Sequence, residues 1–147
     1  MNKKQYDKLA DNLKPEKHIL KNCINAFIYG GVIGIIGQGL LDFYMYYFDT
    51  SEKEATPMMI ITIVLIAVIL TGFGVYDKLA KHAGAGTFIP ITGFANSMAS
   101  SAIESKSEGL VTGIGASMFK LGGTVITFGI VASFILGGIR YAIEYFW

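Results

Sequence analysis

Long apolar runs separated by short polar segments dominate the chain and predict its helices. Residues 26–48 carry one charged residue, Asp42, and residues 57–76 carry none. A third apolar run covers residues 109–143. A helix crosses a hydrocarbon core of ~30 Å with about 20 residues, because each residue adds ~1.5 Å. The pattern therefore predicts an all-α integral membrane protein with three full transmembrane helices. The last run is longer than the core, so we expect it to project, tilt or kink at residues 122–123.

Residues 83–103 form a fourth uncharged segment of a different composition. Helix-interrupting and polar residues are frequent in it, among them Gly84, Gly86, Thr87, Pro90, Thr92, Gly93, Asn96 and Ser97. Backbone groups that leave a helix in hydrocarbon cost several kcal/mol each, so such a segment must be shielded by protein or line an aqueous cavity. We expect a broken or re-entrant segment, because the charged residues Glu104 and Lys106 follow it closely. A fourth span, interrupted at residues 90–93, is the alternative.

Polar and small residues recur at helical spacing in two of the predicted spans. In the first span Gly34, Gln38 and Asp42 share one face, and in the last span the shared residues are Gly113, Lys120, Gly123 and Thr127. One interpretation is close packing between helices. The other is a face along a wet path, where Lys120 and the ends of interrupted helices would suit an anionic solute. Asp42 and Lys120 either pair with one another or have separate roles, and the sequence leaves both open.

Composition agrees with a single membrane domain, since 52% of the 147 residues are hydrophobic and 16% are charged. Residues 1–22 contain six lysines interleaved with acidic residues, which predicts a cytosolic segment at the membrane surface and argues against nucleic-acid binding. A single cysteine, Cys23, excludes an internal disulfide and a cysteine-based zinc site. Catalytic and metal-binding motifs such as HExxH and the Walker pattern are absent, so we expect no enzyme activity, cofactor or metal.

Two stretches resemble a known family over nearly the whole chain. GAGTFIPITGFANSMASSAIESKSEG at residues 84–109, GVIGIIGQGLLD at residues 31–42 and the lysine-rich start are similar to the SpoVA family of spore membrane proteins. The resemblance implies a role in moving dipicolinic acid, with Ca²⁺, across the inner membrane of the forespore and endospore during sporulation and germination. It also implies other SpoVA subunits as partners, namely a small AE-type membrane subunit and a soluble subunit that binds the solute. The N-terminus would then face the spore core.

Two classes of function follow from these patterns. In the first, the chain is a channel or transporter subunit, opened by membrane tension in one version. In the second, it is a non-conducting scaffold that docks other SpoVA proteins. Three or four spans do not enclose a sizeable pore, so the first class requires a homo- or hetero-oligomer.

Overall fold

The computed structural model describes residues 18–146, and within this range the chain is helical with no strand. The expected surface segment at residues 1–22 falls mostly outside the described residues, and its end already belongs to the first described helix. In chain order the elements are α2 (Ile19–Phe48), α3 (Glu52–Gly72), α4 (Tyr76–Ala83), α5 (Ala85–Phe88), α6 (Ile91–Glu104), a 3-10 turn (Ser105–Glu108), a π-helical turn (Leu110–Gly115) and α7 (Ala116–Phe146).

Within the described range, three helices are long and apolar enough to cross a membrane: Ile19–Phe48, Glu52–Gly72 and Leu110–Phe146. The prediction of an all-α membrane protein with three candidate spans is therefore confirmed. The boundaries of the second helix differ from residues 57–76. α3 begins at Glu52, because Ser51 and Glu54 form a capping box in which the Glu54 carboxylate accepts from the Ser51 amide at 3.3 Å. It ends at Gly72, before a turn in which Gly74 has a φ of 67°.

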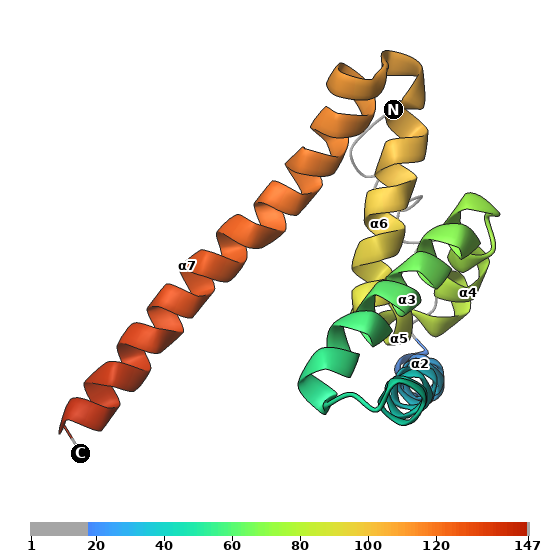
Figure 1. Cartoon of the computed structure of the whole chain (residues 1–147). Helices are drawn as coiled ribbons and strands as arrows, with labels where there is room; N and C mark the ends of the chain where they lie inside the picture. Colours follow the sequence, from blue (N-terminus) through green and yellow to red (C-terminus); the bar gives the residue numbers. More distant parts are fainter. Residues whose placement is uncertain (1–17, 147) are drawn as a thin grey trace.

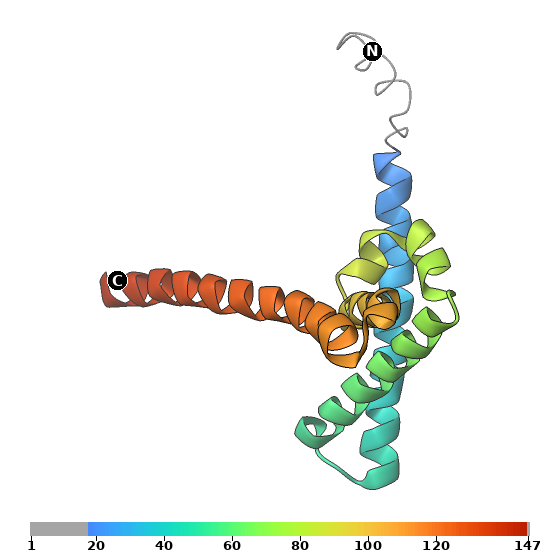
Figure 2. The ribbon, with the colours of Figure 1, turned by 90° about the horizontal axis from the view of Figure 1, so that it is seen from above.

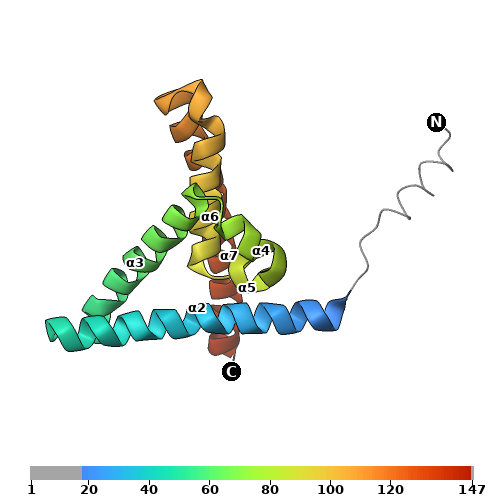
Figure 3. The same cartoon turned by 90° about the vertical axis from the view of Figure 1, so that its right-hand side faces the viewer.

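α2 and α3 are joined at one end and diverge from there (Figure 3). Near the turn, the Tyr44 and Thr62 hydroxyls share a hydrogen bond of 2.8 Å. Further along, Gly37 of α2 is buried against the side chain of Ile63 of α3. Because Gly37 has no side chain, the two helices lie close at this contact. Farther from the turn that joins them, the helices separate and other elements lie between them.

The space between the diverging helices is filled by α4, α5 and α6 (Figures 1 and 3). α4 turns back from the end of α3, α5 packs on α2, and α6 packs on α3. A small core forms where these helices meet, with Ala67, Tyr76 and Ala95 buried at its centre. The segment between α3 and the α6 C-terminus thus lies inside the folded part of the chain.

α7 leaves this folded part after its first turns (Figures 1 and 2). None of residues 116–146 is buried in the single chain. α7 continues as a helix through both glycines at residues 122–123 and projects from the folded part, which is one of the outcomes expected of this long run, while the kink stays a prediction. The departure from α-helical geometry comes earlier, in the π-helical turn, where a Cβ on Gly113 would overlap the Ser105 carbonyl oxygen. Glycine lowers helix propensity by ~1 kcal/mol relative to alanine, which permits a break without requiring one.

Candidate functional site

The uncharged segment at residues 83–103 is where the helical path of the chain is interrupted. The first interruption is at Gly84, whose φ of 52° separates α4 from α5. The second is a bend at Ile89 and Pro90, where Pro90 adopts an extended conformation as the N-cap of α6. The expected interruption at residues 90–93 is therefore displaced, since Thr92 and Gly93 are already helical. A proline is tolerated at a helix start because it has no N–H to be left unpaired there.

Two glycines of the segment are contact points. Gly86 is buried against α2, and a Cβ there would overlap the Ala26 carbonyl group. Gly93 is buried against the end of α5, and a Cβ there would overlap the Thr87 and Phe88 carbonyl oxygens. Both positions therefore require the absence of a side chain, which is the physical reason that the segment packs so closely on its neighbours.

The hydroxyl of Tyr76, the first residue of α4, joins the two sides of the bend. It donates to the Thr87 carbonyl oxygen over 3.0 Å and shares a second hydrogen bond of 2.9 Å with the Thr92 hydroxyl. All three residues are at most 6% exposed. The Thr87 hydroxyl in turn donates to the Gly84 carbonyl oxygen at 3.1 Å. Backbone groups freed by the bend thus find partners within the protein, as low-dielectric surroundings demand.

A second polar cluster holds the middle of α6. The Thr71 hydroxyl lies 2.7 Å from both Asn96 Oδ1 and the Ala67 carbonyl oxygen. On its other side, Asn96 Nδ2 donates to Asp77 Oδ1 at 3.4 Å. Sequence reasoning missed Thr71, Tyr76 and Asp77. Their position at the end of the apolar run at residues 57–76 could have indicated polar contacts there. The run does not indicate which residues of the following segment each would contact.

The remaining predicted residues of the segment and of the stripes lie apart from these clusters. Ser97 donates to the Gly93 carbonyl oxygen of its own helix at 3.0 Å. On α2, Gln38 Nε2 donates to Asp42 Oδ1 at 2.8 Å, and both side chains are exposed. The other stripe residues on α2 and α7 are Gly34, Lys120, Gly123 and Thr127, which are exposed, whereas Gly113 is buried in the turn before α7. Within residues 18–146, Asp42 and Lys120 do not form an ion pair.

The buried side-chain polar groups of the junction are used internally. Among the described residues, no buried side-chain nitrogen or oxygen lacks a hydrogen-bond partner. A cavity of about 250 Å³ lies beside the junction between α2, α3 and α4, and its lining is mainly aliphatic, including Ile33, Ile63 and Leu70. An anion has no polar partner to replace its hydration there. The buried junction around Tyr76 is therefore shielded by protein, whereas Gly84, Phe88 and Ile89 of the same segment are exposed on the single chain.

Comparisons with known proteins identify the family of the chain. Residues 22–139 match the SpoVAC/SpoVAEB sporulation membrane protein family. The chain is 51% identical over 142 residues to stage V sporulation protein AC of Bacillus subtilis (strain 168), covering 97% of this chain and 95% of that relative. No solved structure matches. Helices of transmembrane length and a match over most of the sequence lead to one conclusion: this chain belongs to the SpoVAC/SpoVAEB family of sporulation membrane proteins.

Proposed function

We propose that this chain is a membrane subunit of an assembly that moves dipicolinic acid, with Ca²⁺, across the spore inner membrane during sporulation and germination. The observation that carries the proposal is the doubly interrupted, charge-free segment at residues 83–103, packed at the centre of the folded part of the chain. Interrupted helices at membrane depth are a recurrent way to build solute sites, because their half-helix ends can meet a ligand. The Gly84 and Thr87 carbonyl oxygens are paired within this chain, so the proposal requires a second conformation in which the segment opens to the solute. The printed name of the relative from Bacillus subtilis supports the sporulation setting.

The packing of α6 supports a re-entrant segment over a fourth span. The Ser105 hydroxyl, just after α6, is 2.5 Å from that of Ser117 in the first turn of α7, so α6 ends on the side where α7 begins. The hydrogen bond between Asn96 and Asp77 links the middle of α6 to the start of α4. The segment would then enter and leave on the side where α3 ends. With the lysine-rich N-terminus in the spore core, α7 crosses outward.

The spacing of charges gives Asp42 and Lys120 separate places. About 31 Å of helix separates Lys21 from Asp42, and about 30 Å separates Lys120 from Arg140. Each distance is close to the thickness of a hydrocarbon core, ~30 Å. If both helices cross the membrane, which requires α7 to turn from the crosswise direction that it has relative to α2 in Figure 2, the four charges would border the core, with Asp42 at the outer side and Lys120 at the inner side. This arrangement favours separate roles for the two residues over a pair.

While the junction around Tyr76 stays packed, a single chain offers no path for the solute. A path across the membrane then requires more than one chain. α7 offers a whole helix for contact with other SpoVA subunits, among them the small AE-type membrane subunit, while the soluble subunit would deliver the solute. Membrane tension is the proposed opening stimulus, since widening of the bilayer would draw the diverging helices α2 and α3 apart around the packed segment.

A non-conducting scaffold is the second candidate. It is favoured by the fully satisfied polar groups of the junction and by the unburied α7. Reconstitution separates the two candidates: the purified chain in liposomes loaded with dipicolinate releases it on osmotic downshift if it conducts, and retains it if it is a scaffold. Release is followed by the luminescence of external terbium.

A matched pair of variants tests whether the interrupted segment is the pathway. Ser97 and Thr124 both donate to a carbonyl oxygen of the preceding turn in their own helices: Ser97 to Gly93 at 3.0 Å, and Thr124 to Leu121 at 2.7 Å with Lys120 at 3.2 Å. Ser97→Leu on α6 should lower release severalfold, whereas Thr124→Leu on α7 should leave it unchanged. Equal release from both variants and the parent chain would remove the segment from the pathway.

A further inference from the structure

Two adjoining hollows follow the contact between the first half of α2 and the α4–α5 turn. The first has a volume of about 450 Å³ and the second of about 300 Å³. Ala26 and Ala85 line both, so the hollows form one continuous groove. The groove is distinct from the hydrogen-bonded junction around Tyr76, which lies on the other side of α5.

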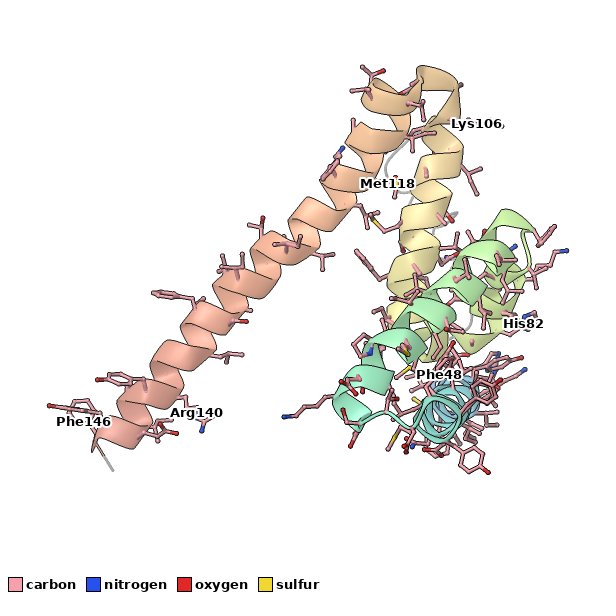
Figure 4. The ribbon with its side chains drawn as sticks, in the orientation of Figure 1. Phe48, His82, Lys106, Met118, Arg140 and Phe146 are labelled. Atoms are coloured by element: carbon pink, nitrogen blue, oxygen red, sulfur yellow. The ribbon has the colours of Figure 1, made fainter. Side chains whose placement is uncertain are left out.

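The wider end of the groove is polar and basic. Lys81 and His82 line it from the end of α4, and Asn22 lines it from α2. His82 projects from the end of α4 close to α2 (Figure 4). Its Nδ1 lies 2.9 Å from the Lys78 carbonyl oxygen, which can only accept, so Nδ1 donates there and Nε2 of the neutral ring is an acceptor. The N–H donors offered to an anion at this end are therefore those of Lys81 and Asn22. No acidic residue among those described lines this end.

The acidic residue of α4 is directed elsewhere. Asp77 accepts from Asn96 on α6 and is not part of the groove lining. The charge offered to a ligand at the wide end is therefore the positive charge of Lys81. Negatively charged groups are the ligands that such an end attracts.

The narrower end is apolar and extends along α2 toward the middle of the span. Phe27 and Gly31 line it from α2, and Ile89 and Pro90 line it from the bend before α6. Its floor is the close contact between Gly30 and Gly86, where a Cβ on Gly30 would lie 3.5 Å from the Gly86 Cα. A charged solute gains nothing from such walls, whereas a hydrocarbon chain does.

We propose that this groove binds one anionic phospholipid, with its phosphate at Lys81 and Asn22, beside His82, and an acyl chain between Phe27 and Ile89. A basic end near Lys21 and an apolar end inside the span match the two halves of a lipid in order and in direction. A bound lipid would lie directly against the Gly84 turn and the Pro90 bend. The site stands whether or not the chain conducts.

Cys23 gives a direct readout, since it lines the wide end and is the single cysteine of the chain. The full-length protein is placed in nanodiscs of phosphatidylglycerol or of phosphatidylcholine, and the rate of maleimide labelling of Cys23 is measured. We expect labelling about fivefold slower in phosphatidylglycerol. Equal rates in the two lipids would overturn the proposal.

Three variants separate the two halves of the site. Lys81→Gln with His82→Gln should abolish the lipid-dependent difference in labelling, and Lys78→Gln on the same helix should preserve it. Gly31→Leu fills the narrow end without meeting any described atom near its Cβ. It should lower phosphatidylglycerol retention in native mass spectrometry about fivefold, with helix content checked by circular dichroism. Unchanged retention in both the double variant and Gly31→Leu would also overturn the proposal.

Other occupants give different outcomes. If inorganic phosphate in phosphatidylcholine nanodiscs protects Cys23 as well as phosphatidylglycerol does, the groove is a site for a soluble anion, and the lipid proposal is wrong. If protection in phosphatidylcholine rises with the number of chains per disc, a second copy covers the groove, and the lipid proposal is again wrong. Protection that needs phosphatidylglycerol and the apolar end together supports it.

Discussion

α3 and α7 are both apolar enough to cross a membrane, yet they relate to the rest of the chain in opposite ways. α3 buries Ala55, Ile63, Ala67 and Thr71 against other helices of its own chain. α7 buries no residue, and Arg140 and Phe146 project from it far from any other element (Figure 4). Hydropathy indicates that a helix is stable away from water. It does not indicate whether lipid or protein surrounds the helix, because the two surroundings are similarly apolar.

The glycines of the two regions show the same contrast. In the packed part, Gly86 and Gly93 leave no room for a Cβ. On α7, Gly123 and Gly129 have no described atom within 4 Å of one. Small residues allow close approach between membrane helices, so glycines on a helix that packs on little of its own chain are consistent with the proposed contact of α7 with another chain. The comparison can be tested by making equal changes in both regions.

The largest difference is expected for alanine at Gly93 and at Gly123. Gly93→Ala forces a methyl group into the Thr87 and Phe88 carbonyl oxygens and should lower the free energy of unfolding by ~3 kcal/mol. Gly123→Ala adds only helix propensity and should raise it by up to ~1 kcal/mol. Unfolding in detergent with increasing denaturant measures both values. Equal effects at the two positions would contradict the packing of α5 against α6.

The next largest difference in stability is expected between phenylalanine substitutions at Tyr76 and at Tyr145. Tyr76→Phe removes the hydroxyl that joins Thr87 and Thr92, and the buried groups left without a partner should cost ~1–3 kcal/mol. Tyr145→Phe removes a hydroxyl from a side chain of α7 that is 74% exposed and should change little. Hydrogen exchange of the Thr87 and Thr92 amides should rise in the first variant alone. Unaltered exchange there would show that the tyrosine does not hold the bend.

A substitution on the exposed surface of α7 should weaken association with other SpoVA subunits without changing the stability of the chain. Gly123→Leu places a large side chain on the face that also carries Thr127, and we expect about tenfold less complex with other SpoVA subunits, which corresponds to ~1.4 kcal/mol. Val125→Leu on a different part of the same helix is the control. Co-purification and native mass spectrometry measure the complex. If both variants associate like the parent, α7 faces lipid in the assembly.

These contrasts explain which features could be predicted from the sequence. Uncharged runs of about 20 residues follow directly from the thickness of the bilayer, so the helical membrane class and its three candidate spans were accessible. The unusual composition of residues 83–103 predicted a broken or re-entrant membrane segment, and in the structure this range holds a turn at Gly84 and a bend at Pro90, while its place in a membrane stays a prediction. The positions of the interruptions were not accessible, because Gly93 serves close packing and Gly84 serves the turn, and composition does not distinguish these uses of glycine.

Partners of polar residues were even less accessible. The sequence favoured Thr92 and Asn96 as polar residues of a possible solute path. Their hydrogen-bond partners, Tyr76 and Thr71, come from the start of α4 and the end of α3. Such pairs depend on how α6 crosses α3, which is a property of the packed structure. Likewise, the course of α7 at residues 122–123 depends on contacts such as the one between Gly122 and Met98 of α6, which the local sequence does not encode.

The smallest effect concerns Asp42 and Lys120, the two charges proposed to border the membrane. If Asp42 and Lys120 lie at opposite sides of the hydrocarbon core, Asp42→Asn and Lys120→Gln should act independently. Each should change the free energy of unfolding of the chain by less than ~0.5 kcal/mol, and the double variant should equal the sum of the single variants within ~0.5 kcal/mol. A coupling energy above ~1 kcal/mol would indicate contact between them. Measuring the cycle both in detergent, where the chain is alone, and in the assembled complex distinguishes a pair within one chain from a pair between subunits. Additivity in both settings is the outcome that the charge spacing along α2 and α7 predicts.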